Sequence, residues 1–277
     1  MGPAIVLESI YRQRLALTLR DAAGTYKELV GVTVDQVMKS MHKDFQTMAA
    51  PFRKVKGFHT LFRIFDKYHE ACLQEPRLCP LYLLPKVHKP GVEVRPIVPN
   101  LNYYTCQTST FLHHILESKV FRNEHVLRDS LSLIRKLDQV NVPLNHKLRF
   151  ATFDVTALYP SIDLERGLNS LKWYLETFCC EFPHDVKKLV LALARFVLTH
   201  CYISCPEVSA DPFLQLIGTA MGTSFAVVYA NIHVFSIETE IAYSFNTYYH
   251  FYFRYINDGI TLWHGSDEDF LVLFWSI

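Results

Sequence analysis

The sequence predicts an α+β fold in which amphipathic helices alternate with short strands and hairpins. Three patterns lead to this prediction. Apolar residues recur at helical spacing over several stretches, residues 150–155 form a short apolar run, and two segments have the turn residues typical of β-hairpins. With 277 residues, half of them hydrophobic, the chain is long enough for one large domain or two modest ones.

Residues 1–75 are predicted to be mostly helical. Val34, Val37 and Met38 recur at helical spacing, and a second stripe of Phe and Leu follows at 58–65. Stripes of this kind normally face a core, so we assign them no function. Seven cations and only two acids lie between residues 39 and 67, which suits either a solvated helix face or a nucleic-acid contact.

Residues 81–98 are predicted to form a hairpin that turns at Pro90-Gly91. This dipeptide suits a type II turn between two extended arms. The arms would bring Lys86 and Arg95 near one another. Such a pair suits a triphosphate, because Arg makes bidentate contacts and Lys supplies a point charge. The alternative is a charged, solvated edge hairpin.

The remaining elements follow from the same patterns. In chain order they are two helices within 111–137, a buried-type strand at 150–155, helices at about 163–177 and 185–200, a glycine turn at 218–222, an apolar helix at 226–241 and a hairpin around Asn257. The chain ends in an apolar segment, 270–275. Because exposed apolar residues are a liability, we expect a truncated domain there, with a closing helix as the alternative.

Two carboxylates stand at strand ends that are far apart in the sequence. Asp154 ends the apolar strand, and Asp258 lies in the acidic turn of the last hairpin. Nucleotidyl transfer uses two divalent ions about 3.5–4 Å apart, and carboxylates on adjacent antiparallel strands could hold them. The alternatives are conformational: an Asp after a strand is often a helix cap, and Asp258-Gly259 is a favoured hairpin turn.

Further residues could line such a site. Tyr159, five residues after Asp154, could stack under a nucleotide sugar and exclude a 2′-hydroxyl, or it could be an ordinary core tyrosine. Gln215 and the turn from Gly218 to Gly222 could let the backbone approach a nascent base pair, because glycine has no side chain.

The order and spacing of these motifs resemble the reverse transcriptase domain of Penelope-like retroelements over residues 76–264. The matching segments are, in chain order, 84–91 (LPKVHKPG), 95–98 (RPIV), 153–162 (FDVTALYPSI), 218–222 (GTAMG), 230–232 (ANI) and 254–258 (RYIND). The resemblance implies a right-hand polymerase fold with the thumb missing. Residues 76–147 would form the fingers. Residues 148–277 would form a C-terminally truncated palm, an antiparallel sheet with helices on one face.

The resemblance also implies roles for single residues. Lys86 and Arg95 would contact the incoming nucleotide. In the palm, Asp154 and Asp258 would be metal ligands, Tyr159 the sugar gate, and Gln215, Gly218 and Gly222 supports for template and nucleotide. The cofactor would be two Mg²⁺ ions, with Mn²⁺ as an alternative. The partners would be an RNA template with a DNA primer and a deoxynucleoside triphosphate.

Asn257 departs from the family pattern, which has Asp at this position of its Tyr-x-Asp-Asp motif. An amide oxygen is a poorer magnesium ligand than a carboxylate, so we expect a loss of about 10²-fold or more in rate. Two hypotheses follow. The chain is an RNA-directed DNA polymerase domain with Asp154, Asn257 and Asp258 at its catalytic centre, or it is an inactive truncated relic that at most binds nucleic acid. A telomerase-like polymerase would need an RNA-binding domain, for which 1–75 is too short.

Cysteine usage and hydropathy bear on location. The seven cysteines form an odd set without framework spacing, which favours a reducing, intracellular compartment. No signal peptide and no apolar run of about 20 residues occurs, so no membrane contact is predicted. The resemblance implies the nucleus, and the oligomeric state is left open.

Overall fold

The computed structural model describes residues 7–86, 93–141, 148–245, 249–269 and 271. The predicted Pro90-Gly91 turn lies outside these residues. So does the apolar segment 270–275, except for Leu271.

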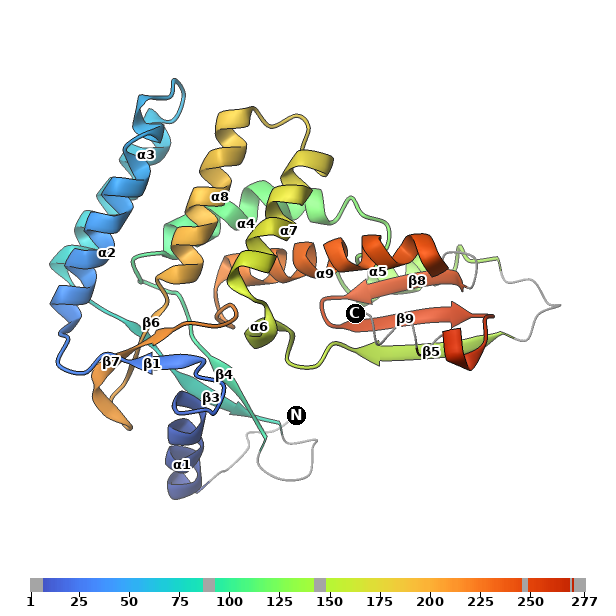
Figure 1. The fold of residues 1–277 in the computed structure, drawn as a ribbon, viewed down its shortest axis with the longest axis horizontal. Coiled ribbons are helices and arrows are strands. Elements are labelled where there is room, and N and C mark those ends of the chain that lie inside the picture. The colour runs from blue at the N-terminus through green and yellow to red at the C-terminus, as the bar shows by residue number, and fades with distance from the viewer. Residues whose placement is uncertain (1–6, 87–92, 142–147, 246–248, 270, 272–277) are drawn as a thin grey trace.

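Helices make up most of the chain (Figure 1). They are α1 (Glu8–Leu19), α2 (Val34–Ala49), the 3₁₀ turn η1 (Phe52–Lys54), α3 (His59–Gln74), α4 (Cys106–Val120), α5 (Ser130–Leu137), α6 (Leu158–Ser161), α7 (Leu164–Phe178), α8 (His184–Thr199) and α9 (Ser224–Phe245). All helices predicted from apolar spacing are present. Three of them begin at residues whose side chains cap the helix: Thr33 accepts from the amide of Gln36, Asp129 from that of Ser132, and Asp163 from that of Arg166.

The strands form three separate sheets. They are β1 (Tyr26–Glu28), β2 (Cys79–Pro80), β3 (Tyr82–Pro85), β4 (Val94–Ile97), β5 (Arg149–Asp154), β6 (Tyr202–Cys205), β7 (Ser209–Gln215), β8 (Tyr249–Tyr255) and β9 (Asp258–Trp263). The predicted hairpins are present as antiparallel β3–β4 and β8–β9, and the predicted strand is β5.

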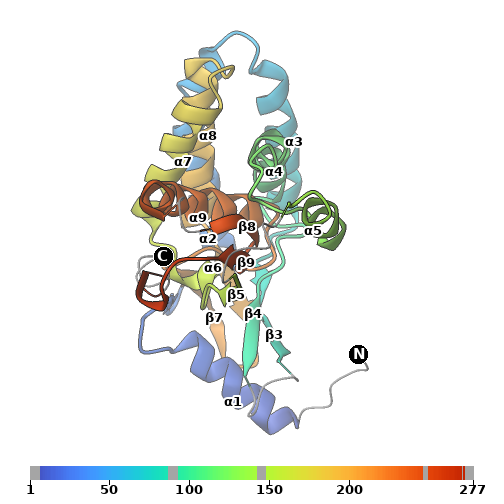
Figure 2. The ribbon, with the colours of Figure 1, turned by 90° about the vertical axis from the view of Figure 1, so that its right-hand side faces the viewer.

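The three-stranded sheet has the order β5-β9-β8, with antiparallel pairs throughout. One face packs on α9, which runs along β8 in Figures 1 and 2. On the other face, Phe251, Phe253 and Leu262 form a small cluster with Leu133 and Leu137 of the short helix α5. The predicted α+β fold with helices against an antiparallel sheet is therefore confirmed, and α5 covers part of the second face in addition.

A four-stranded sheet, β1-β7-β6-β2, was not predicted. Tyr26 pairs with Gln215 in antiparallel β1–β7, while the two-residue strand β2 runs parallel to β6. The strand β1 interrupts the region predicted to be mostly helical. The strands of this sheet come from all three predicted regions, on both sides of residues 75 and 147. The two domain boundaries themselves stay predictions.

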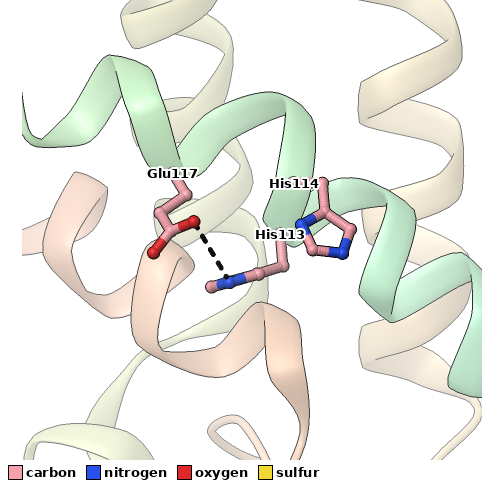
Figure 3. A group of neighbouring side chains, drawn as sticks. All are labelled: His113, His114 and Glu117. Carbon is pink, nitrogen blue, oxygen red and sulfur yellow. Dashed lines mark ion pairs between the residues drawn. The ribbon is translucent and has the colours of Figure 1, made fainter.

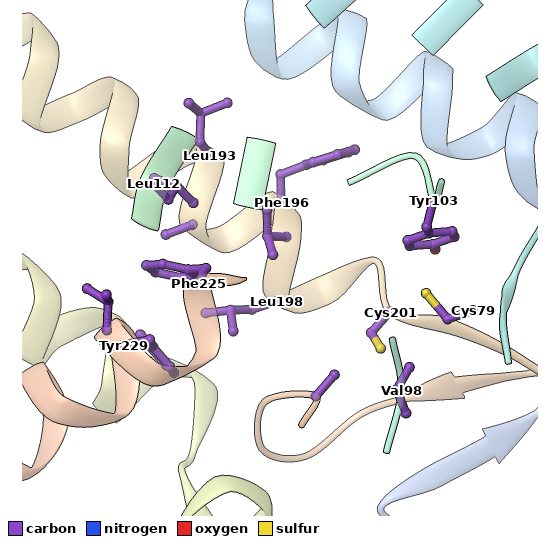
Figure 4. Packing of buried hydrophobic residues seen from close by; sticks show 14 of the residues in the cluster. Cys79, Val98, Tyr103, Leu112, Leu193, Phe196, Leu198, Cys201, Phe225 and Tyr229 are labelled. Atoms are coloured by element: carbon purple, nitrogen blue, oxygen red, sulfur yellow. The ribbon is translucent and has the colours of Figure 1, made fainter. Parts of the chain in front are cut away.

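The main core lies where α4, α7, α8 and α9 pack together. Figure 4 shows Phe225 of α9 close to Leu112 of α4 and Leu193 of α8, with Tyr229 further along α9. All four side chains are buried. Helix α9 therefore joins the core on one side to the three-stranded sheet on the other. Among the described helices, none is both long enough and apolar enough to cross a bilayer.

A buried histidine lies among aromatic rings in the α2–α3 region. His69 of α3 is 0% exposed, its ring stacks on Tyr104 with centroids 3.8 Å apart, and Phe45 packs edge-on at 4.2 Å. Burial, with a smaller contribution from His42, lowers the pKa of His69 to about 3. The folded protein therefore keeps this imidazole neutral.

This burial predicts acid sensitivity. The unfolded chain protonates His69 near its ordinary pKa of about 6.5, whereas the folded chain resists down to about 3. The contribution of His69 to the free energy of unfolding is therefore fully present above the pKa of the unfolded chain, about 6.5. As the pH falls below this value, the free energy of unfolding decreases by up to about 1.4 kcal/mol per pH unit. Urea unfolding between pH 7.5 and 5 should show this slope, and His69→Phe should reduce it. The exposed control His59→Gln should leave it unchanged. An equal slope in the His69→Phe protein would contradict the prediction.

Candidate functional site

The β8–β9 hairpin turns at Ile256 and Asn257. Tyr255 pairs with Asp258 in the ladder, so Asp258 and Gly259 belong to β9 and do not form the turn. Ile256 has a φ of 56°, in the left-handed region that β-branched residues rarely adopt. The chain therefore needs specific contacts to hold this turn.

Arg254 supplies those contacts from the α9 face of the sheet. Its side chain is fully buried, and its guanidinium binds both carboxylate oxygens of Glu238 on α9, at 2.5 and 3.1 Å. Its Nη1 donates to Asn231 Oδ1 at 2.8 Å and to the carbonyl oxygen of Ile256 at 2.6 Å. The same side chain thus ties the strand to α9 and the turn to the strand.

The ion pair outweighs the cost of burying the charge of Arg254. Burial alone would lower its pKa, but the Glu238 carboxylate raises the pKa above the ordinary value. Glu238 also accepts from the hydroxyl of Tyr252. On the outer edge of β8, the backbone of Arg254 binds His125 and Leu127 at 2.8 and 2.7 Å. The hairpin is therefore fixed through both the side chain and the backbone of one residue.

The two predicted carboxylates meet across the sheet. Asp154, the last residue of β5, pairs with Asp258, the first residue of β9. The next pair, Val155 and Asn257, is joined by a backbone hydrogen bond of 2.9 Å. Asp154 and Asp258 are therefore a non-hydrogen-bonded pair, whose Cβ atoms lie about 4.5–5.5 Å apart on one face. Both residues are exposed.

Gly259 sets this pairing by sterics. It lies opposite Phe153, and a Cβ placed on it would come within 1.9 Å of the Phe153 ring. A side chain at this position would force the Phe153 ring to move away. Any shift of β5 against β9 would place a larger residue there, so the register that pairs Asp154 with Asp258 is strongly favoured.

Asn257 contacts the same corner from the turn. Its Nδ2 donates to Asp154 Oδ1 at 2.5 Å. None of the described cations forms an ion pair with Asp154 or Asp258. The two exposed carboxylates form an all-oxygen ligand set that suits a hard divalent ion such as Mg²⁺, whereas the atom that Asn257 presents to Asp154 is a nitrogen. Asp154 and Asp258 are the residues that could hold it, with Asn257 as a neutral neighbour.

The carboxylates line an open pocket of about 570 Å³. Its apolar wall comes from Leu127, Leu133, Phe253 and Ile260, on the face of the sheet that α5 covers in part. The opening gives solutes access to the strand ends where the acids lie.

Tyr159 and Gly218 lie side by side. Ala157, with φ of 52°, turns the chain from β5 into α6, which carries Tyr159. The amide of Thr219 donates to the carbonyl oxygen of Tyr159 at 2.8 Å. A Cβ on Gly218 would lie 2.5 Å from that oxygen and from Pro160 Cα, so only glycine permits this approach. Burial, with a smaller contribution from Tyr255, raises the pKa of Tyr159.

Gly222 and Gln215 hold the other parts of the same turn. A Cβ on Gly222 would lie 2.7 Å from the carbonyl oxygen of Val98. The amide of Val98 in turn donates to the carbonyl oxygen of Met221 at 2.7 Å. This contact joins the segment after β4 to the glycine turn. Gln215 is buried, and its Nε2 donates to the carbonyl oxygen of Ile217 at 2.9 Å. Its side chain therefore supports the turn from within.

Lys86 and Arg95 lie on the β3–β4 hairpin. Arg95 pairs with Leu84 and is exposed, while Lys86 binds Glu93 at 3.2 Å. Since side chains alternate along strands, Lys86 and Arg95 share one face as diagonal neighbours. Figures 1 and 2 show this hairpin below the three-stranded sheet. The predicted closeness of the two cations is thus consistent with the register.

Three residues with a central structural part had no predicted role: Arg254, Glu238 and Asn231. A signal for two of them was present in the sequence. Arg254 is the one cation within the aromatic strand β8, and Glu238 lies deep in an apolar helix. Opposite charges in two otherwise apolar elements indicate a buried pair, although the exposed Glu240 in the same helix carries the same signal.

The Arg254–Glu238 pair generates a stability prediction. Glu238→Ala should lower the free energy of unfolding by about 3–5 kcal/mol, because it leaves a buried charge without its partner. Urea unfolding measures the change. A double variant, Arg254→Met with Glu238→Leu, should be more stable than either single variant. The exposed pair of Arg195 and Glu165 is the control, and Glu165→Ala should change stability little. Equal effects at Glu238 and Glu165 would contradict the prediction.

Gly218 allows a second, matched test. Gly24 also has a positive φ, 66° against 76° for Gly218, but a Cβ placed on Gly24 would have no atom within 4 Å. Gly24→Ala should therefore cost only the backbone strain, about 1–2 kcal/mol. Gly218→Ala should cost about 1–3 kcal/mol more, because its Cβ meets backbone atoms that cannot move away. Chemical denaturation of both variants measures the difference, and equal losses would contradict the close approach.

The geometry can be compared with known proteins. No protein-family model matches the chain, and no curated protein does. Among solved structures, the apo telomerase of Candida tropicalis truncated from its C-terminal domain matches 72% of this chain and 45% of its own, at 11% identity and a TM-score of 0.52. The telomerase of Candida albicans in complex with a TWJ fragment of telomeric RNA matches 75% and 41%, at 12% identity and a TM-score of 0.56.

These likenesses concern the fold alone, because the identities are low. The chain spans less than half the length of either telomerase structure. Together with the sheet and helices described above, they show that the chain has part of a polymerase fold, comprising palm and fingers.

Proposed function

We propose that this chain is the palm and fingers of an RNA-directed DNA polymerase from a Penelope-like retroelement. The observation that carries the proposal is the pairing of Asp154 with Asp258 at the end of a rigid antiparallel sheet, with Asn257 in contact. The telomerase-like fold and the ordered motifs from Lys86 to Asp258 support it. The partners would be an RNA template, a DNA primer and a deoxynucleoside triphosphate.

In this proposal, the reaction joins the primer 3′-oxygen to the α-phosphorus of the nucleotide. The bond to pyrophosphate breaks, and the proton of the 3′-hydroxyl passes to solvent. Bound between Asp154 and Asp258, two Mg²⁺ ions would neutralise the charge that develops on the phosphate oxygens. No covalent intermediate with the protein is needed. The contribution of the chain is to position the reactants and to complement their charge.

The other motif residues would hold the nucleotide in place. Lys86 and Arg95 would bind its triphosphate from the exposed face of the β3–β4 hairpin. Tyr159 would lie against the sugar, with Gly218 fixing its backbone. Gln215 would act indirectly, as a positioning residue, because its side chain is buried in the turn that it supports.

A second candidate function is an inactive domain that retains nucleic-acid binding. The contact between Asn257 and Asp154 favours it. The Asn257 amide donates to a carboxylate oxygen of Asp154 that would otherwise be free to bind a metal ion. Unlike a carboxylate, the amide contributes no negative charge of its own. Both effects weaken cation binding at this corner.

Primer extension on an RNA template separates the two candidates. The unaltered chain should extend slowly with Mg²⁺, and Asn257→Asp should raise the rate by about 10²-fold by restoring a carboxylate. Asp154→Asn in either background should abolish extension.

Circular dichroism and template–primer binding are the controls, since all variants should remain folded and bind equally. Extension that survives Asp154→Asn would overturn the metal assignment. A folded Asn257→Asp protein that binds template–primer without extending it would favour the inactive domain.

A further inference from the structure

A group of metal-binding side chains lies on α4, outside the site described above. His113, His114 and Glu117 each offer one ligand atom, and these three atoms all lie within 4.8 Å of one another. Figure 3 shows the two imidazoles and the carboxylate on one turn of the helix. Among the described residues, this is the one group of three or more His, Cys, Asp or Glu side chains with such spacing.

Helix geometry makes this convergence informative. Residues three and four apart share a helix face, so Glu117 is within reach of both histidines. Consecutive residues, by contrast, point about 100° apart around the axis. His113 and His114 nevertheless have ring centroids only 5.4 Å apart. One ligand atom of each ring and of Glu117 all lie within 4.8 Å of one another, close enough to share one ion.

The ligand atoms are available. His113 Nε2 lies 3.5 Å from Glu117 Oε2, which is long for a good hydrogen bond, and neither side chain forms a further ion pair with the described residues. His113 Nδ1 is buried without a hydrogen-bond partner, so an ion cannot reach it. Nε2, the ring nitrogen on the side of Glu117, is the atom that can serve as a ligand. His114 is exposed, which gives an ion a route from solvent.

The helix itself is a rigid support. Leu112 and Leu116, on the inner face of the same turns, are 0% exposed in the main core. The backbone that carries the three side chains is therefore fixed by packing against α8 and α9, and little backbone order has to be gained on binding.

The donor set decides which ion fits. Two imidazole nitrogens and one carboxylate oxygen are typical ligands of Zn²⁺, which accepts three protein ligands with water in the fourth position. Magnesium prefers oxygen ligands alone, which makes this group different from the corner formed by Asp154 and Asp258. We propose that His113, His114 and Glu117 bind one zinc ion and that the ion links one full turn of α4.

The test uses the whole chain, stripped of metal by chelator and then titrated with zinc. We expect one tight equivalent per chain by competition with a chromophoric chelator. Zinc at about ten times the dissociation constant should raise the melting temperature by about 3 °C. Cobalt in place of zinc should give the visible absorption bands of a low-coordinate site.

Variants decide whether the named residues hold the ion. His114→Ala and Glu117→Gln should each weaken zinc binding by at least about tenfold, since even outer-shell changes cost that much. Both positions are accessible, so both variants should fold, which circular dichroism checks. His184→Ala, at an exposed histidine that begins α8, is the matched control and should bind as the unaltered chain does.

A second histidine pair provides the sharpest contrast. His250 and His264 have ring centroids 4.9 Å apart at the far end of the sheet. If zinc binding is lost in the His250→Ala and His264→Ala double variant but kept in His114→Ala and Glu117→Gln, the proposal is overturned. A dissociation constant above about 1 mM, the affinity of a weak contact, overturns it as well.

Discussion

The placement of Asp154 and Asp258 depends on a buried ion pair that contacts neither of them. Arg254 and Glu238 join β8 to α9, and the same guanidinium holds the carbonyl oxygen of Ile256 in a turn that isoleucine does not favour. Buried pairs contribute little net stability, but they give strong geometric preference because any other arrangement leaves a charge unpaired. Contacts on the α9 face of the sheet thus position the tip of the hairpin, and the opposite face, where Asp154 and Asp258 line the pocket, stays open to ligands.

The glycine turn after β7, residues 218–222, connects the other parts of the site. Gly218 lies against Tyr159 and Pro160, and Gly222 lies against Val98. Three segments that are distant in the sequence, namely the chain after β4, the α6 turn and the glycine turn that precedes α9, thereby touch through backbone atoms. Side-chain substitutions elsewhere would disturb these contacts little, whereas a methyl group at either glycine would separate the segments.

How much the sequence could predict differs between elements. Long helices such as α7 and α8 were found because a core selects one apolar face over many residues. The strands β1, β6 and β7 were missed, because Tyr26–Glu28 is short and polar and Ser209–Gln215 contains a proline, so their pairing depends on distant partners. Asp154 and Asp258 could be named from their motifs. For Arg254 the sequence offers only the signal of a charge in an apolar strand, because the helix residue that it contacts has no local pattern.

Gly259 has a consequence for the acidic corner that extends beyond register. Like charges opposite one another on a sheet repel, and strands would ordinarily relieve this by slipping or fraying. The Phe153 ring over Gly259 opposes that escape, because a larger residue beneath it would push the ring aside. The two carboxylates therefore stay opposite one another, and salt or a bound cation, not strand movement, is what lowers their repulsion. This end of the sheet thus keeps a local negative potential, moderated at Asp154 by the amide of Asn257, and a residue with neither charge nor side chain helps to maintain it.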